Sequence, residues 1–239
     1  MRNLSIKGYL KWNQKPNKVI VFWDSCMLLD ILRIPVRTDG KVALYYREIL
    51  DLADSKKIDF VASRLSWTET SVNYNQVSLE LKDYANNTRN NLTKYYQTIS
   101  GLGRDYFIAV KNDINGEVIQ NNLADLYNNM FVPMTLLQER VEYMKQAHYR
   151  VGNHYPPAKQ KGEYKDCFIW MTFLDLAKQL SPGDAIFFMT ANTADYCETN
   201  QKGVLDRLLS SDISALKCRS KVLFSIYELM GELHSLAII

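Results

Sequence analysis

Four acidic residues sit at positions where a parallel sheet would gather them. Asp24, Glu69 and Asp195 each follow a predicted strand, and Asp166 opens a predicted helix that leads into another strand. In a parallel α/β sheet, strand ends and the N-termini of crossover helices share the carboxyl edge, where ligands bind near the point of strand-order reversal. We therefore expect these four side chains to lie near one another.

Acids brought together in this way repel one another and raise each other's pKa values. A divalent cation relieves that repulsion, and oxygen-only ligands suit Mg²⁺ or Mn²⁺. Such an ion can lower the pKa of a bound water and stabilise charge on a phosphodiester. The pattern thus predicts metal-assisted phosphodiester hydrolysis without a His or Cys nucleophile, supported by Thr190 and Asn192 at the end of the strand before Asp195.

Each acid taken alone also has a structural interpretation. Asp24 could be an ordinary N-cap for a helix at 26–32, and Asp166 could equally be a cap. Glu69 alone is more often a solvated surface acid, and Asp195 could cap a turn. The joint placement of the four residues favours the functional interpretation.

Apolar runs without alternation predict four strands buried on both faces. These strands are expected at residues 18–23, 59–63, 184–190 and 221–225. Helical spacing of apolar residues between them predicts helices at 41–55 and 166–180. Strands that alternate with helices indicate an α/β fold with right-handed crossovers.

The middle of the chain has a different character. Residues 73–150 are expected to form a helical insertion, with Leu136 and Leu137 belonging to a helical pattern over 118–150. We interpret residues 1–239 as a single domain that carries this insertion.

Composition and charge exclude several classes of protein. The chain has 239 residues, 47% of them hydrophobic, and a net charge of +3, which disfavours a strongly basic nucleic-acid coat protein. No apolar run approaches the roughly 18 residues that a membrane span needs. The N-terminal residues contain no apolar signal region, and the four cysteines form no CxxC pair. We expect a cytoplasmic protein with reduced cysteines, no zinc site and no membrane partner.

At the acidic residues the chain resembles the PIN-domain nucleases, and in particular a PIN-like group with a long insertion. The resemblance rests on three ordered motifs: Val-Ile-Val-Phe-Trp-Asp over 19–24, Lys-Asp-Cys-Phe-Ile-Trp over 165–170, and Thr-Ala-Asn-Thr-Ala-Asp-Tyr over 190–196. It implies a three-layer α/β/α fold with a central parallel sheet. It also implies an RNA-cleaving enzyme, usually an endonuclease directed at single-stranded RNA.

The resemblance further implies roles for the acidic residues. Asp24 and Asp166 would hold the principal Mg²⁺ or Mn²⁺, and Asp195 would complete the site directly or through water. Glu69 would bind a second ion or orient the attacking water, and Asn192 would be a neutral variant at its position.

A basic and aromatic loop over 151–165 precedes Asp166. Lysines can follow phosphates and tyrosines can stack on unpaired bases, which suggests RNA binding. The residues that could do so include Lys159, Lys161, Lys165 and Tyr164. A merely solvated loop is the alternative.

Three other interpretations stay open. A PIN-like domain could bind RNA or a protein without cleaving. A phosphatase or phosphoryl-transfer domain could use Asp24 as its nucleophile, but Cys26 occupies the place where that chemistry wants a second acid. A toxin or defence effector would share the active-site chemistry and act on single-stranded or structured RNA. An antitoxin or regulatory protein, or a second copy of the chain, would then be a partner.

Overall fold

The computed structural model describes residues 1–101, 116–159 and 163–239. The strands are β1 (Arg2–Leu4), β2 (Val19–Trp23), β3 (Asp59–Ser63), β4 (Thr135–Leu137), β5 (Ala185–Met189) and β6 (Arg219–Leu223). The helices are α1 (Ile6–Trp12), α2 (Ser25–Leu29), α3 (Ile34–Arg37), α4 (Val42–Asp54), α5 (Arg64–Gly101), α6 (Gly116–Phe131), α7 (Tyr143–Gly152), α8 (Tyr164–Lys178), α9 (Thr193–Tyr196), α10 (Arg207–Ser214) and α11 (Ile226–Ser235).

Within these described ranges, six parallel strands form one sheet in the order β1-β4-β3-β2-β5-β6. Val21 of β2 lies opposite Phe60 of β3 on one side and Phe187 of β5 on the other. The chain passes from β2 toward β3 but later returns to place β5 on the opposite side of β2. The strand order therefore reverses between β2 and β5, which confirms the predicted parallel sheet and locates its switch point.

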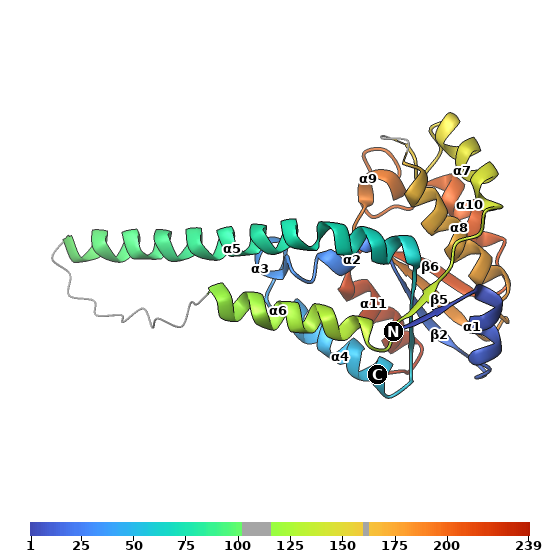
Figure 1. The fold of residues 1–239 in the computed structure, drawn as a ribbon, viewed down its shortest axis with the longest axis horizontal. Coiled ribbons are helices and arrows are strands. Elements are labelled where there is room, and N and C mark those ends of the chain that lie inside the picture. Colours follow the sequence, from blue (N-terminus) through green and yellow to red (C-terminus); the bar gives the residue numbers. More distant parts are fainter. Residues whose placement is uncertain (102–115, 160–162) are drawn as a thin grey trace.

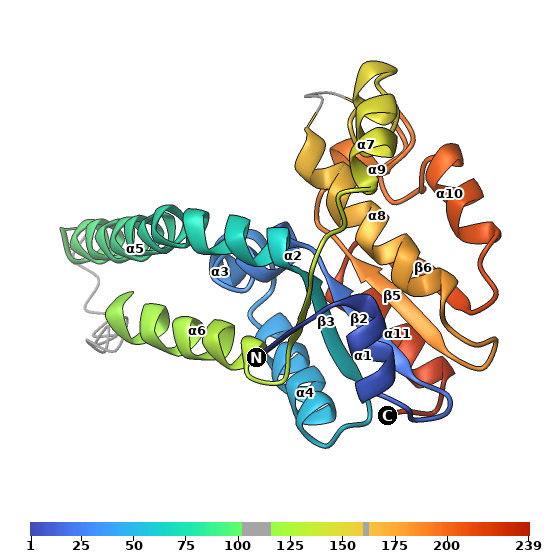
Figure 2. The same ribbon diagram turned by 45° about the vertical axis from the view of Figure 1, so that its right-hand side comes forward.

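Side-chain alternation along β2 divides the core into two layers. Val21 and Trp23 pack with side chains of α2 to α6 and α11 on one face. Ile20 and Phe22 pack with side chains of α1 and α7 to α10 on the other. All five residues of β2 are buried, because helices cover both faces. The result is the expected three-layer α/β/α arrangement, which Figure 2 shows.

Two strands, β1 and β4, were not expected from the sequence. The prediction of helix across Leu136 and Leu137 is wrong, since both lie in β4 between β1 and β3. β4 is only three residues long, and all three are buried in the sheet. Their apolar character continues the pattern of the preceding helix, so periodicity alone does not separate the two elements.

α5 is a single helix of 38 residues, about 57 Å long at the usual rise of 1.5 Å per residue. It extends well beyond the sheet, with α6 alongside its first half (Figure 1). The side-chain amide of Gln120 on α6 donates to Ser78 Oγ on α5 at 2.6 Å. The helical character expected for 73–100 is confirmed, whereas its role as an insertion in one domain stays a prediction. None of the described helices has the length and apolar character needed to cross a bilayer.

Candidate acidic active site

The first strand-end residue, Asp24, lies at the switch point of the sheet. Its backbone N–H donates to the Met189 carbonyl at the end of β5, 3.0 Å away. The Thr190 hydroxyl, one residue beyond β5, donates to Asp24 Oδ2 at 2.7 Å. α2 leaves β2 toward one face of the sheet and α9 leaves β5 toward the other. The divergence of these helices opens the edge where Asp24 and Thr190 meet.

Asp24 is almost fully buried and is also the N-cap of α2. Its Oδ1 accepts a hydrogen bond from the Ser25 backbone N–H at 2.7 Å, and its Oδ2 accepts one from the Cys26 thiol at 3.1 Å. Burial raises the pKa of Asp24, although the hydrogen bonds from Cys26 and Thr190 oppose that rise. Asp24 is therefore a helix cap, and its role in a metal site stays a prediction.

Glu69 lies in the second turn of α5, because α5 begins directly after β3. Its Oε2 accepts a hydrogen bond from the Ser25 hydroxyl at 2.6 Å. Its Oε1 lies 2.5 Å from the Lys165 ammonium, which also pairs with Glu163 at 2.9 Å. Burial alone would lower the pKa of Lys165, but the hydrogen bonds to the two glutamates raise it overall. Ser25 and Lys165 thus connect the N-terminal parts of α2, α5 and α8 through Glu69.

Asp166 is in the first turn of α8, and it has the most unusual surroundings in the site. Its carboxylate accepts no hydrogen bond from the described residues, so it does not cap α8. Burial raises its pKa to about 8, with further contributions from nearby carboxylates. Those carboxylates belong to Asp24, Glu69, Glu163 and Asp195. Asp166 therefore holds its proton to a higher pH than an ordinary aspartate does.

Asp195 is held at the start of α9 by Asn192. The Asn192 side-chain amide donates to Asp195 Oδ2 at 3.0 Å, and Asn192 Oδ1 accepts from the Asp195 backbone N–H at 3.3 Å. The Asn192 backbone N–H in turn donates to Thr190 Oγ1 at 3.1 Å. Thr190 and Asn192 therefore form a chain of hydrogen bonds that fixes Asp24 and Asp195 relative to one another.

The four acids singled out from the sequence all lie at the carboxyl edge. Ser25 links Asp24 to Glu69, and Asp166 is under the electrostatic influence of the other three acids. Sequence reasoning missed three neighbours of these acids: Ser25, Cys26 and Glu163. Ser25 could have been found as the small polar residue that follows Asp24 in the motif. The sequence holds no comparable signal for the contact between Lys165 and Glu69.

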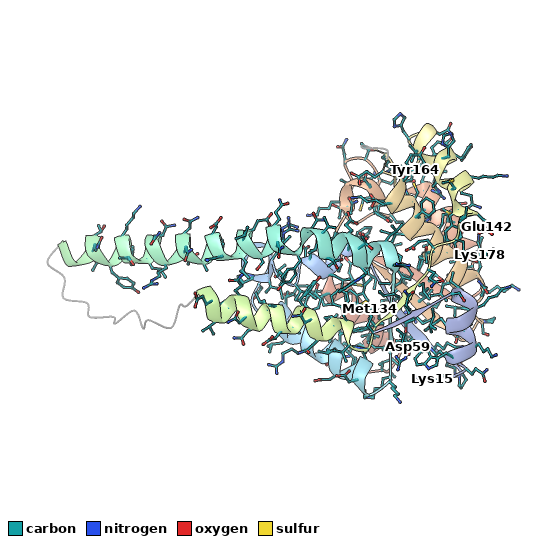
Figure 3. All side chains as sticks on the ribbon, viewed as in Figure 1. Lys15, Asp59, Met134, Glu142, Tyr164 and Lys178 are labelled. Carbon is teal, nitrogen blue, oxygen red and sulfur yellow. The ribbon has the colours of Figure 1, made fainter. Side chains whose placement is uncertain are left out.

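The residues proposed to bind RNA are not all equally accessible. Tyr164 is exposed at the start of α8, where its hydroxyl lies 2.9 Å from His148 Nδ1 (Figure 3). Lys159 is engaged instead by Asp206, at 2.5 Å, and by the Cys197 carbonyl, at 2.7 Å. Lys161 lies outside the described residues. A role for these residues in RNA binding stays a prediction.

The chemical type of the available ligand atoms suits a hard divalent cation. Asp24, Asp166 and Asp195 offer only carboxylate oxygens, the ligands that Mg²⁺ prefers. No hydrogen-bond donor among the described residues would compete with a metal ion for the carboxylate of Asp166. Within those residues, however, no three His, Cys, Asp or Glu side chains are already close enough to enclose a metal ion. Binding an ion would therefore have to draw the carboxylates inward.

Comparison with known protein families gives one match. The family model described as PIN domain matches residues 21–196, well over half of the chain. The chain therefore belongs to the PIN-domain family, and the matched span contains Asp24, Glu69, Asp166 and Asp195. This is a nuclease-type family whose members typically use divalent metal ions such as Mg²⁺ and interact with nucleic acid. No curated protein and no solved structure matched the chain in the corresponding comparisons.

Proposed function

We propose that this protein is a Mg²⁺- or Mn²⁺-dependent ribonuclease that cleaves single-stranded RNA endonucleolytically. The observation that carries the proposal is the environment of Asp166. Burial, together with the charges of four other acids, raises its pKa to about 8, and it has no hydrogen-bond donor among the described residues. A structural carboxylate that is largely withdrawn from water is expected to have hydrogen-bond partners, and the partly buried Asp166 has none among the described residues. A strongly perturbed acid at a ligand-binding edge is typical of a functional site.

In this proposal Asp24 and Asp166 are the principal metal ligands, and Asp195 completes the site directly or through water. Thr190 and Asn192 keep two of these ligands in place through their hydrogen bonds. Such supporting contacts orient ligating carboxylates and sharpen metal affinity. When bound, the ion would lower the pKa of a water molecule and offset charge on the scissile phosphate.

RNA would approach the carboxyl edge past the N-terminal turn of α8. Lys165 is about half exposed and Tyr164 is exposed, so both are accessible to an incoming strand. A cation can contact phosphate oxygens, and a tyrosine ring can stack on an unpaired base. The expectation that Lys159 contacts phosphate has less support, because its ammonium is already paired with Asp206.

The proposal is tested by cleavage of a mixed-sequence single-stranded RNA in Mn²⁺. Wild-type protein should cut the RNA internally, chelation by EDTA should stop the reaction, and Asp166→Asn should reduce the rate by at least about a hundredfold. A DNA strand of the same sequence tests the preference for RNA. Equal cleavage by wild type and Asp166→Asn would refute the proposal, because a contaminating nuclease would then explain the activity.

The alternative is a PIN-like domain that binds RNA or protein without cleaving. It is favoured by one observation, namely that no three potential ligands among the described residues already enclose an ion. RNA binding that is unaffected by Mn²⁺, together with no cleavage at any metal concentration, would support this alternative over the enzyme.

The biological setting refines the same proposal. We propose residues 1–239 as a single cytoplasmic PIN-like domain with an insertion over 73–150, acting as a toxin or defence effector with a cognate antitoxin or regulatory protein. Growth inhibition on expression that disappears in Asp24→Asn would support this role. Normal growth with active protein in the cell would favour a housekeeping ribonuclease instead. A homodimer is a further proposal, which the molecular mass in solution would test.

A further inference from the structure

Glu69 differs from the other acids of the site because both of its carboxylate oxygens are already engaged. Oε2 accepts the Ser25 hydroxyl at 2.6 Å, and Oε1 contacts the Lys165 ammonium at 2.5 Å. Ser25 is buried and the Glu69 side chain is only 20% exposed, so the contact with Ser25 is shielded from water, whereas the Lys165 side chain is 44% exposed. The carboxylate of Asp166 has no such partner among the described residues.

The charges of the site divide into two groups. Lys165 pairs with Glu69 and Glu163, and it is the only base that pairs with any acid of this site in the described part of the chain. The remaining acids, Asp24, Asp166 and Asp195, have no basic partner among the described residues. One divalent cation would largely neutralise these three acids, whereas the two glutamates already share a cation that belongs to the chain.

We propose that the Lys165 ammonium takes the place of a second metal ion, so that the site binds a single divalent cation and Glu69 is not a metal ligand. This inference rests on the proposed metal-dependent function and narrows it. A lysine ammonium is a compact charge on a flexible stem, well suited to stand in for an ion beside a carboxylate. A second divalent ion at Glu69 would have to displace this ammonium and would be repelled by it at short range.

The inference also assigns Lys165 a position in the reaction. Its side chain is 44% exposed while its ammonium contacts Glu69. The same group can therefore hold Glu69 and face an incoming phosphate. A phosphate oxygen contacting this ammonium would meet positive charge beside Glu69 without a second ion.

The number of bound ions tests the inference directly, in the absence of RNA. Mn²⁺ titrations of the full chain, followed by electron paramagnetic resonance of the free ion and by calorimetry, should give one Mn²⁺ per chain for wild type. Lys165→Met frees Glu69 and should bind two ions. Lys165→Arg keeps the charge and should bind one. The double variant Lys165→Met/Glu69→Gln removes the freed carboxylate and should return to one.

Other outcomes would overturn the inference. These are two ions in wild type, one ion in Lys165→Met, or a loss of about tenfold or more in Mn²⁺ affinity in Glu69→Gln alone, as expected for a ligand. Far-ultraviolet circular dichroism of each variant confirms that it is folded. A wild-type protein that binds two ions and still cleaves RNA contradicts only this inference, whereas a protein that binds no Mn²⁺ and cleaves nothing contradicts the proposed function.

Discussion

Buried acids lie at both edges of the central sheet, but their partners differ. At the amino edge, Asp184 is only 2% exposed, and its carboxylate accepts backbone N–H groups of Lys18 and Ser181 at 2.7 and 2.9 Å. The Lys18 ammonium lies 3.6 Å away. At the same edge, Asp59 accepts a hydrogen bond from the Asn13 amide at 2.8 Å and pairs with Lys15. These acids have the donors that burial demands.

At the carboxyl edge, Asp24, Glu69 and Asp195 also accept hydrogen bonds, but Asp166 does not. Asp166 feels the charges of four other carboxylates and has no donor among the described residues. In Figure 3, Tyr164 of the α8 N-terminal turn lies near the top of the view, whereas Asp59 and Lys15 lie near the bottom. Burial alone therefore does not distinguish the acids of the two edges. Asp166 is distinguished by its lack of donors among the described residues and by the like charges near it, and our proposal rests on that difference.

Neutralising one acid at each edge tests whether the two edges differ in function. Asp24→Asn removes a principal ligand and should reduce Mn²⁺-dependent RNA cleavage by about a thousandfold or more, equivalent to roughly 4 kcal/mol. Asp184→Asn should leave the rate per folded molecule nearly unchanged. Initial rates under saturating Mn²⁺, normalised to the folded fraction, provide the test. A comparable loss in both variants would mean that the two edges do not differ in function.

The same two edges should respond oppositely in stability. Asp184→Asn replaces an acceptor of two backbone N–H groups and a lysine, and it should cost about 2–3 kcal/mol in free energy of unfolding. Asp166→Asn removes a negative charge that nearby carboxylates repel. It should therefore leave the free energy of unfolding unchanged or raise it in metal-free buffer. Urea denaturation at pH 8 in EDTA measures both. A large destabilisation by Asp166→Asn would make Asp166 a structural residue.

The free energy of unfolding should also depend on pH through Asp166. The pKa of Asp166 is about 8 in the folded protein and near 3.9 in the unfolded chain, so the folded state holds the proton more tightly. Stability contributed by this group is therefore present below about pH 4 and lost as the pH rises toward 8. We expect a loss on the order of 2 kcal/mol, after allowing for solvent screening.

Asp166→Asn should flatten this pH dependence in metal-free buffer, whereas Asp184→Asn should keep it. The burial-raised pKa of Asp24 acts in the same direction, so some slope should remain in Asp166→Asn. Unfolding free energies measured from pH 5 to pH 8.5 in EDTA provide the comparison. An identical slope in wild type and Asp166→Asn would show that Asp166 titrates normally.

A smaller effect is expected at Thr190. Thr190→Val keeps the shape of the side chain but removes the hydroxyl that donates to Asp24 Oδ2 at 2.7 Å. The thiol of Cys26 still donates to the same oxygen. We expect a loss of about 1 kcal/mol in stability and a drop of about tenfold in cleavage rate. Thr190→Ser retains the donor and is the matched control, and equal losses in the two variants would point to packing instead.

Much of the fold follows from sequence because its strongest patterns are local. The apolar runs of β2 and β5 predict strands buried on both faces, and β3 has the expected bounds of Asp59–Ser63. β1 and β4 are too short, at three residues each, to produce a recognisable pattern. Their pairing depends on neighbours far away in sequence. α5 was expected only in part because its polar, Asn-rich composition hides a continuous helix.

The positions of the acids in the site follow from the topology of the sheet and could be predicted from the sequence. Asp24 and Asp195 follow strand ends, and the parallel sheet brings such positions to one edge. The contacts that distinguish the acids from one another are not local. Glu69 meets Ser25 across 44 positions and Lys165 across 96, and no spacing in the sequence signals either contact. Lys165 was accordingly expected to contact phosphate rather than a glutamate.

Thermal unfolding with and without Mn²⁺ shows whether the carboxyl-edge acids bind a metal ion, because it reports binding without requiring the right RNA. If the carboxyl-edge acids form a metal site, millimolar Mn²⁺ should raise the melting temperature of wild type and of Asp184→Asn, since the ion binds only the folded state. The rise should be lost or greatly reduced in Asp166→Asn. A wild-type melting temperature that Mn²⁺ leaves unchanged, or an equal rise in Asp166→Asn, would contradict this account.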